Sequence, residues 1–311
     1  MIVRVLLGRS GLQVSPICYG TWQLSPRFWG DQPQEVVLES IRHAFDLGIN
    51  FIDTADAYGD GYAEQILGKA LAELPRDELV LATKVFHHFD AAGNRHPDLT
   101  GDYVLTACEA SLRRLRTDRI DLYQLHSFDP LTDPTSTIDA LEKLRQQGKI
   151  GAYGCSNWTV EQIRMGQSLG ANLMTGQPRY NLIHRQIEGD LLPYCLAHEI
   201  GVLVYSPLLL GLLTGKFDGR ETFSDVRRSN PDFQGDRFQM ICDRVRQLRP
   251  IASGYDLTIV QLVLAVTLMH PAITCVIVGI KTPRQIEEAV GAMGKTISIK
   301  DAHQIREILR V

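Results

Sequence analysis

Four polar side chains follow apolar runs of the chain, at positions where their chemistry could be combined. Asp53 and Tyr58 follow one run, Lys84 ends a second, and His126 ends a third. A buried lysine needs a counter-ion, which Asp53 can supply. An ammonium beside a phenol favours the phenolate and lowers the pKa of the phenol. We therefore expect Tyr58 to give a proton to an oxygen that gains negative charge.

This set of side chains suits the polarisation of a carbonyl. His126 can hydrogen-bond the same oxygen and stabilise the charge that forms there. No nucleophile stands beside a base, so hydrolysis through a covalent intermediate is disfavoured. Each residue alone has a structural alternative, because Asp53 could cap a helix and Tyr58 or His126 could serve only in packing. Their placement at the ends of successive strands favours the functional interpretation.

The segments that carry these residues alternate between strand and helix patterns. Short apolar strands are predicted at 17–21, 50–53, 79–84, 121–125, 150–155, 173–177, 202–206 and 273–278. Amphipathic helices are predicted at 34–47, 63–74, 103–115, 135–147, 160–169, 188–198, 237–248, 258–269 and 284–293.

Eight strands in alternation with helices predict an α/β fold in which a parallel sheet closes into a (β/α)8 TIM barrel. We expect one domain over residues 1–311, with a β-hairpin at 3–15 and extra C-terminal helices. An open dinucleotide-binding sheet is disfavoured, because Tyr19-Gly20-Thr21-Trp22 stands where G-x-G-x-x-G would be needed.

The composition narrows the classes of partner. The chain has 311 residues and a net charge of −4, without the basic balance typical of nucleic-acid binding. No apolar run suits a membrane span or a signal peptide. The six cysteines form no C-x-x-C pair, and His87, His88 and His96 lack metal-ligand spacing. We therefore expect a cytoplasmic protein without a metal, and the oligomeric state stays open.

Two long segments interrupt the alternation, at 86–100 and 217–238. Both follow predicted strands, so they lie at the carboxyl end of the barrel, where loops form active sites. Trp22, Trp29, Phe86 and His87 are candidates for the substrate pocket, with 217–238 as a lid. The tail at 300–309, after the last predicted helix, is short.

The segment 48–59, Gly-Ile-Asn-Phe-Ile-Asp-Thr-Ala-Asp-Ala-Tyr-Gly, resembles the signature of the aldo-keto reductases. The resemblance extends over nearly the whole chain, through 7–12, 20–22, 122–126, 154–157 and 205–208. It implies a (β/α)8 barrel that reduces a small-molecule aldehyde or ketone with NADPH. A long C-terminal tail often shapes the pocket in this family, so the short tail at 300–309 implies an open site with broad carbonyl specificity. The catalytic residues of the family carry over to Asp53, Tyr58, Lys84 and His126.

The same resemblance implies where the cofactor lies. The positions that it assigns to the nicotinamide, the pyrophosphate and the adenosine are Gly20, Thr21, Trp22, Asp53, Ser156, Asn157, Gln177, Tyr205, Ser206, Pro207, Leu208, Gly211, Lys216, Gly279, Lys281, Gln285 and Glu288. Lys281 would pair with a 2′-phosphate and favour NADPH. Ala289 departs from the family, which usually has an asparagine there to meet the adenine, so the preference for NADP over NAD stays open.

Two other functions compete with reduction. One is a cofactor-sensing regulatory subunit with the same fold and little turnover, like the channel-associated β-subunits. The other is a lyase that forms a Schiff base on Lys84, although Asp53 should keep that lysine protonated and poorly nucleophilic. The sequence leaves the physiological carbonyl and the favoured direction open.

Overall fold

The computed structural model describes residues 4–30, 32–89 and 94–311. Eight parallel strands close into a barrel in the order β10, β11, β12, β3, β4, β5, β8 and β9. Their bounds are β3 Ile17–Gly20, β4 Phe51–Asp53, β5 Val80–Val85, β8 Ile120–Leu125, β9 Ile150–Ser156, β10 Thr175–Gln177, β11 Gly201–Tyr205 and β12 Ile273–Gly279. The predicted α/β barrel is confirmed.

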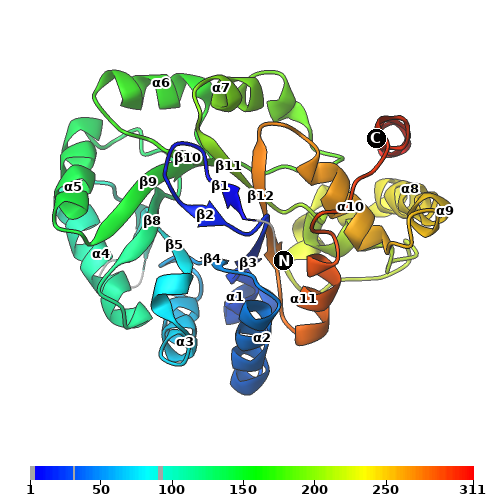
Figure 1. Cartoon of the computed structure of the whole chain (residues 1–311), viewed down its shortest axis with the longest axis horizontal. Helices are drawn as coiled ribbons and strands as arrows, with labels where there is room; N and C mark the ends of the chain where they lie inside the picture. The colour runs from blue at the N-terminus through cyan, green and yellow to red at the C-terminus, as the bar shows by residue number, and fades with distance from the viewer. Residues whose placement is uncertain (1–3, 31, 90–93) are drawn as a thin grey trace.

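Helices surround the barrel (Figure 1). They are α1 Pro26–Trp29, α2 Gln34–Asp46, α3 Tyr62–Leu71, α4 Gly101–Leu115, α5 Pro134–Gln146, α6 Val160–Ser168, α7 Leu191–Ala197, α8 Gly235–Arg246, α9 Arg249–Ser253, α10 Ile259–Leu268, α11 Pro283–Val290 and α12 Ile299–Ile308. Local sequence defines several of their ends. Thr159 with Gln162 and Thr258 with Gln261 form capping boxes that start α6 and α10.

A short antiparallel hairpin, β1 Val5–Leu6 and β2 Gln13–Val14, lies across the barrel (Figure 1). Leu7 and Val14 are fully buried and pack with barrel-interior side chains such as Phe51 and Leu203. The predicted hairpin is therefore present, and it covers one end of the barrel with apolar side chains. Residue 3, where the predicted hairpin begins, lies with residues 1 and 2 outside the described residues.

The structure corrects two expectations about irregular segments. The segment 86–100 contains a second hairpin, β6 His87–Phe89 and β7 Arg95–Pro97, and residues 90–93 within it lie outside the described residues. The tail at 300–309 lies almost entirely in α12, which Ser298 caps through Asp301. Ala302, Ile305 and Leu309 form its buried face, so the helical spacing was present in the sequence.

The expected lid at 217–238 is packed against the molecule. The rings of Phe217, Phe223, Phe233 and Phe238 contact one another with centroids 5.1–6.1 Å apart. Phe233 and Phe238 belong to the same apolar cluster as α8 and α10. The insertion therefore packs on the apolar cluster of α8 and α10, and these ring contacts fix the position of the polar residues between them.

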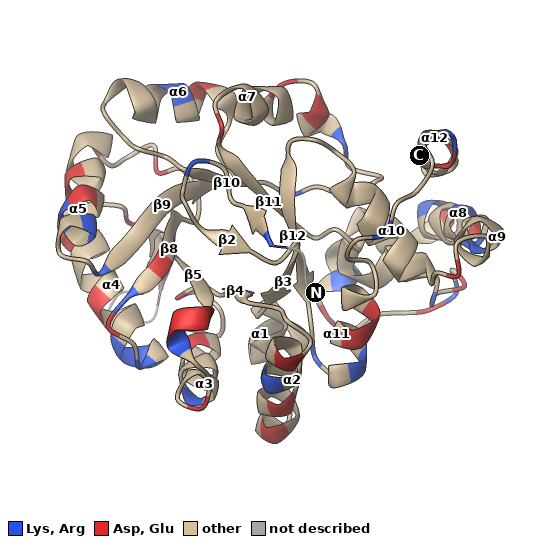
Figure 2. Cartoon of the chain, in the orientation of Figure 1, with Lys and Arg blue, Asp and Glu red and all other residues tan. Residues whose placement is uncertain are grey.

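Charged side chains lie mainly on the outer helices, with both signs interspersed (Figure 2). The outer helices therefore present a charged face to solvent and bury an apolar face, as α2 and α4 do. Among the described residues, no helix is long and apolar enough to cross a membrane.

Candidate active site

The four candidate catalytic residues come from three neighbouring barrel strands. Asp53 is the last residue of β4, Lys84 lies one residue before the end of β5, and His126 directly follows β8. Strands β4 and β5 pair directly, as do β5 and β8. Helix α3 is capped by Gly61, so Asp53 does not serve as a helix cap.

Lys84 is the centre of this group. Its Nζ donates to Asp53 Oδ1 at 2.6 Å, to the carbonyl oxygen of Thr54 at 2.8 Å and to the Tyr58 hydroxyl oxygen at 3.1 Å. The side chain is fully buried, and Asp53 is almost fully buried. Burial acts to lower the pKa of Lys84, but Asp53 and Tyr58 outweigh it and raise that pKa. Lys84 is thus a fixed cation with its three donor sites occupied.

Tyr58 departs from one expectation. Its pKa is raised, because burial disfavours the phenolate more strongly than the Lys84 ammonium favours it. The prediction that Lys84 lowers the pKa of Tyr58 below its ordinary value is therefore wrong for the protein alone. Tyr58 is a fully protonated phenol at neutral pH, and Lys84 acts by stabilising the phenolate once the proton has left.

His126 is poised as a neutral donor. Burial, followed by the charge of Lys84, lowers its pKa well below the ordinary value. Its Nδ1 is buried and has no hydrogen-bond partner among the described residues. A buried N–H donor without an acceptor is rarer in proteins than a buried acceptor without a donor. We therefore infer that Nδ1 is unprotonated and that Nε2 carries the proton. The ring meets Tyr58 edge to face, with centroids 5.8 Å apart.

Asp56, which lies between Asp53 and Tyr58 in sequence, is also buried. Burial and the nearby Glu64 raise the pKa of its carboxyl to about 8. Glu64 is itself occupied by Arg114, at 2.6 Å, and by Thr83. Asp56 is therefore a neutral acid in the turn, and the counter-ion of Lys84 is Asp53 alone.

The residues expected to hold the nicotinamide are linked to the catalytic group. Gln177 Nε2 donates to Asp53 Oδ2 at 2.9 Å, and Ser156 Oγ donates to the Gln177 carbonyl at 2.8 Å. Asn157, which has a left-handed φ of 59°, donates to the His126 carbonyl and accepts from the Tyr205 hydroxyl at 2.8 Å. These hydrogen bonds join β9, β10 and β11 to the Asp53 side of the barrel.

Thr21 ties the start of the β3 loop to the same site, because its N and Oγ1 both donate to the Asp53 carbonyl, at 3.0 and 3.1 Å. It follows Gly20, the last residue of β3. Trp22 lies beyond, and its ring meets Trp29 with centroids 5.4 Å apart.

A second charged group lies where the resemblance places the cofactor phosphates. Lys281 lies over the ring of Trp29 at 4.6 Å, and Arg227 lies 5.6 Å from the same ring. Burial lowers the pKa of Lys281 and of Lys216, and Arg227 lowers both further. Asp225 pairs with Arg227, so three cations meet one carboxylate. Such surplus positive charge fits a ligand that carries phosphates.

The backbone around these cations allows a close approach. Gly211 has a φ of 92°, and an added Cβ there would lie 3.0 Å from Lys216 Nζ. Ser206 also has positive φ, and Leu208 precedes the 3₁₀ segment Leu209–Thr214. Pro207 lies between them. This irregular turn keeps Lys216 folded against its own chain.

The residues that the resemblance assigns to the adenosine, Gly279, Gln285 and Glu288, differ in their contacts and burial. Gly279 faces Gln23, whose Nε2 would lie 1.6 Å from an added Cβ. Gln285 Oε1 accepts from the Lys281 backbone N at 2.8 Å, so it holds the loop that carries Lys281. Glu288 is half-buried on α11, and Ala289 is fully buried in the core.

The sequence prediction missed Arg227. It marked the whole insertion at 217–238 as a lid and assigned no residue within it to the cofactor. Arg227 follows Asp225 by two residues and lies 4.5 Å from the ring of Phe223, so its position depends on the aromatic contacts of the insertion. The candidate substrate residue Trp29 contacts both Arg227 and Lys281, so it lies beside this group of cations.

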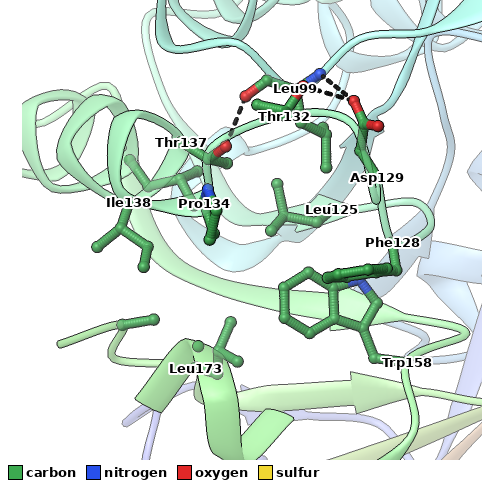
Figure 3. A pocket seen from close by; sticks show the side chains of 13 residues that line it. Leu99, Leu125, Phe128, Asp129, Thr132, Pro134, Thr137, Ile138, Trp158 and Leu173 are labelled. Carbon is green, nitrogen blue, oxygen red and sulfur yellow. Dashed lines mark hydrogen bonds between the residues drawn. The ribbon is translucent and has the colours of Figure 1, made fainter. Parts of the chain in front are cut away.

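Among the other substrate candidates, His87 lies next to His126, and Phe86 packs on His87. The ring of His87 meets His126 at 5.5 Å and Phe86 at 4.7 Å between centroids. A separate cavity of about 20 Å³ lies behind the loops that follow β8 and β9, between Phe128, Leu173 and Trp158 (Figure 3). Its walls are mostly apolar and include none of the four candidate catalytic residues, so it is a packing gap.

A model of the aldo/keto reductase family matches residues 16–310. The chain belongs to the aldo/keto reductase family. A solved structure of this kind, a glycerol dehydrogenase from Gluconobacter oxydans, superposes with a TM-score of 0.91 at 32% identity, covering 99% of this chain and 95% of that one. The eight-stranded barrel is therefore the aldo/keto reductase fold.

Two relatives in sequence differ in the function that their names state. An NADH-specific methylglyoxal reductase of Escherichia coli (strain K12) is 33% identical over 98% of this chain and 98% of its own. A putative voltage-gated potassium channel subunit beta of Schizosaccharomyces pombe (strain 972 / ATCC 24843) is 34% identical over 92% of this chain and 87% of its own. Family membership therefore leaves cofactor preference and turnover to be argued from the site.

Proposed function

We propose that this chain reduces aldehydes or ketones to alcohols with NADPH, and that Tyr58 is the general acid. The observation that carries the proposal is the contact of a buried ammonium, Lys84 Nζ, with the Tyr58 hydroxyl at 3.1 Å. When bound, the nicotinamide cofactor supplies the hydride that the carbonyl carbon accepts. The chain supplies the proton that the carbonyl oxygen needs, so carbonyl, hydride and proton together give the alcohol.

The proton moves along a short path. As the carbonyl oxygen gains charge, the Tyr58 O–H bond breaks and the proton passes to that oxygen. Lys84 then stabilises the phenolate, which recovers a proton from solvent after the alcohol leaves. Proton transfer of this kind contributes about 10²–10⁴-fold to a rate. His126 donates from Nε2 to the same oxygen and stabilises its charge before the proton arrives.

The cation group supports NADPH over NADH. NADPH carries one phosphate more than NADH, and Lys216, Arg227 and Lys281 offer more positive charge than Asp225 neutralises. The NADH-specific relative from Escherichia coli speaks for the opposite preference. The charge balance of this chain's own residues is the more direct guide, because the phosphate is recognised by the side chains that touch it.

A single substitution tests this preference. Lys281→Gln removes one ammonium and keeps a side chain of similar length. We expect it to weaken NADPH about tenfold to hundredfold, since a hydrogen bond to a charged group contributes about 1.5–3 kcal/mol, and to change NADH affinity by less than about threefold. Fluorescence titration with each cofactor measures both dissociation constants. Equal losses for the two cofactors would contradict the preference.

The regulatory-subunit alternative is favoured by the channel-subunit relative. It predicts cofactor binding with negligible carbonyl-dependent turnover. The presence of Tyr58, Lys84 and His126 together speaks for turnover, because cofactor sensing alone needs no proton donor. A cytoplasmic location is also proposed, since all six cysteines are free thiols.

A further inference from the structure

Two imidazoles follow Tyr58 in a row of neighbouring rings, His126 and then His87, and the proposed reduction uses only His126. The rings of Tyr58 and His126 meet edge to face at 5.8 Å, and the rings of His126 and His87 meet at 5.5 Å. His126 serves the reacting oxygen. His87 therefore lies one ring further from Tyr58 than His126 does.

The fold holds His87 in place. It is the first residue of β6, and the Tyr103 hydroxyl donates to its carbonyl at 2.6 Å. The Phe86 carbonyl accepts from the Asp98 backbone N at 2.8 Å, and the Phe86 ring packs edge to face on His87. His88 stacks on Tyr103 at 4.6 Å. The hairpin is thus tied to α4 on the side of His87, and the ring has a defined position.

His87 is suited to a neutral polar partner. The residue is half-buried, and burial together with Arg95 lowers its pKa to about 4. A neutral imidazole offers one donor and one acceptor, so it can serve either a hydroxyl or a carbonyl. A phenylalanine in this position would be the simpler choice for a wall that only excludes water, as Phe86 shows beside it.

The distance between the His87 and His126 rings indicates where a polar group bound to His87 would lie. A hydrogen bond spans about 2.7–3.2 Å between heavy atoms, so two imidazoles with centroids 5.5 Å apart can hold two oxygens on neighbouring carbons. We propose that His87 is a specificity-determining residue that binds an oxygen on the carbon next to the reacting carbonyl. The site would then favour 2-hydroxyaldehydes and 2-oxoaldehydes over unsubstituted aldehydes. This inference rests on the proposed carbonyl reduction and narrows the broad specificity expected from the sequence.

Two aldehydes of equal chain length test it: 2-hydroxypropanal and propanal, with NADPH. The readout is the ratio of their kcat/KM values. In His87→Phe we expect this ratio to fall about threefold to tenfold, the size of one neutral hydrogen bond, mainly through a higher KM for 2-hydroxypropanal. His87→Gln should recover part of the ratio, because its amide again donates and accepts. His96→Phe, on the exposed strand β7, is the matched control and should leave the ratio unchanged.

The possible outcomes distinguish a failure of the proposed role of His87 from a failure of the proposed carbonyl reduction. An unchanged ratio in His87→Phe, with both aldehydes still reduced, overturns the role of His87 and leaves the reductase proposal intact. No NADPH oxidation with either aldehyde in the unaltered protein overturns the reductase proposal itself. Titration with NADPH and a thermal melt on each variant show whether it is folded, and a variant that melts early is replaced by His87→Leu.

Discussion

Replacing Tyr58 with phenylalanine is expected to lower kcat for carbonyl reduction by about 10²–10⁴-fold, the usual contribution of a general acid. The ring remains, so its edge-to-face contact with His126 can persist. Only the hydroxyl that Lys84 Nζ approaches at 3.1 Å is lost. Because the loss is confined to the transition state, kcat and kcat/KM should fall together, while the dissociation constant of NADPH changes by less than about threefold.

Stopped-flow measurement of the nicotinamide absorbance gives the rate of the chemical step, and titration gives the cofactor affinity. Tyr62→Phe is the matched control, because Tyr62 is an exposed tyrosine at the start of α3. It should turn over like the unaltered protein. A Tyr58→Phe variant that keeps its rate would remove Tyr58 from the mechanism, whatever the other residues do.

Replacing Lys84 with methionine is expected to have the largest effect on stability. The ammonium and Asp53 form a buried ion pair at 2.6 Å, and removal of one member leaves a buried charge without its partner. Breaking such a pair lowers the free energy of unfolding by about 3–5 kcal/mol. Gln177 still donates to Asp53, so the lower end of that range is expected. Denaturant titration monitored by circular dichroism measures the change.

The double variant Asp53→Asn with Lys84→Met separates stability from catalysis. It removes both charges, so much of the lost stability should return. The proton-transfer step should stay slow, because nothing stabilises the Tyr58 phenolate in either variant. A double variant that is no more stable than Lys84→Met alone would show that Asp53 is not held as a buried carboxylate by Lys84.

The barrel and the catalytic group were predictable for one shared reason. A strand buried on both faces needs a continuous apolar run. Each barrel strand could therefore be recognised in the sequence by its apolar run, and a polar residue at the end of that run was an exception to the pattern. Asp53, Lys84 and His126 were visible in this way. The boundaries of most strands and helices differ from the prediction by one or two residues, since helix and strand ends depend on local caps.

What the sequence did not reveal depends on contacts between distant segments. The side chain of Arg227 is positioned by the aromatic rings of its insertion and by Trp29, which lies about two hundred residues earlier in the chain. The raised pKa of Tyr58 has burial in the folded barrel as its largest cause, and that burial depends on segments far apart in the chain. The β6–β7 hairpin follows from pairing of His88 with His96 across residues that show no clear strand alternation.

The most direct test of the proposed function is NADPH oxidation by the unaltered protein with a panel of aldehydes, ketones and sugars, followed at the nicotinamide absorbance band, with NADH in parallel. The site described here predicts carbonyl-dependent oxidation of NADPH, with one alcohol formed for each cofactor consumed, and slower turnover with NADH. Tight binding of NADPH without oxidation by any carbonyl of the panel would contradict the reductase mechanism and support a cofactor-sensing subunit.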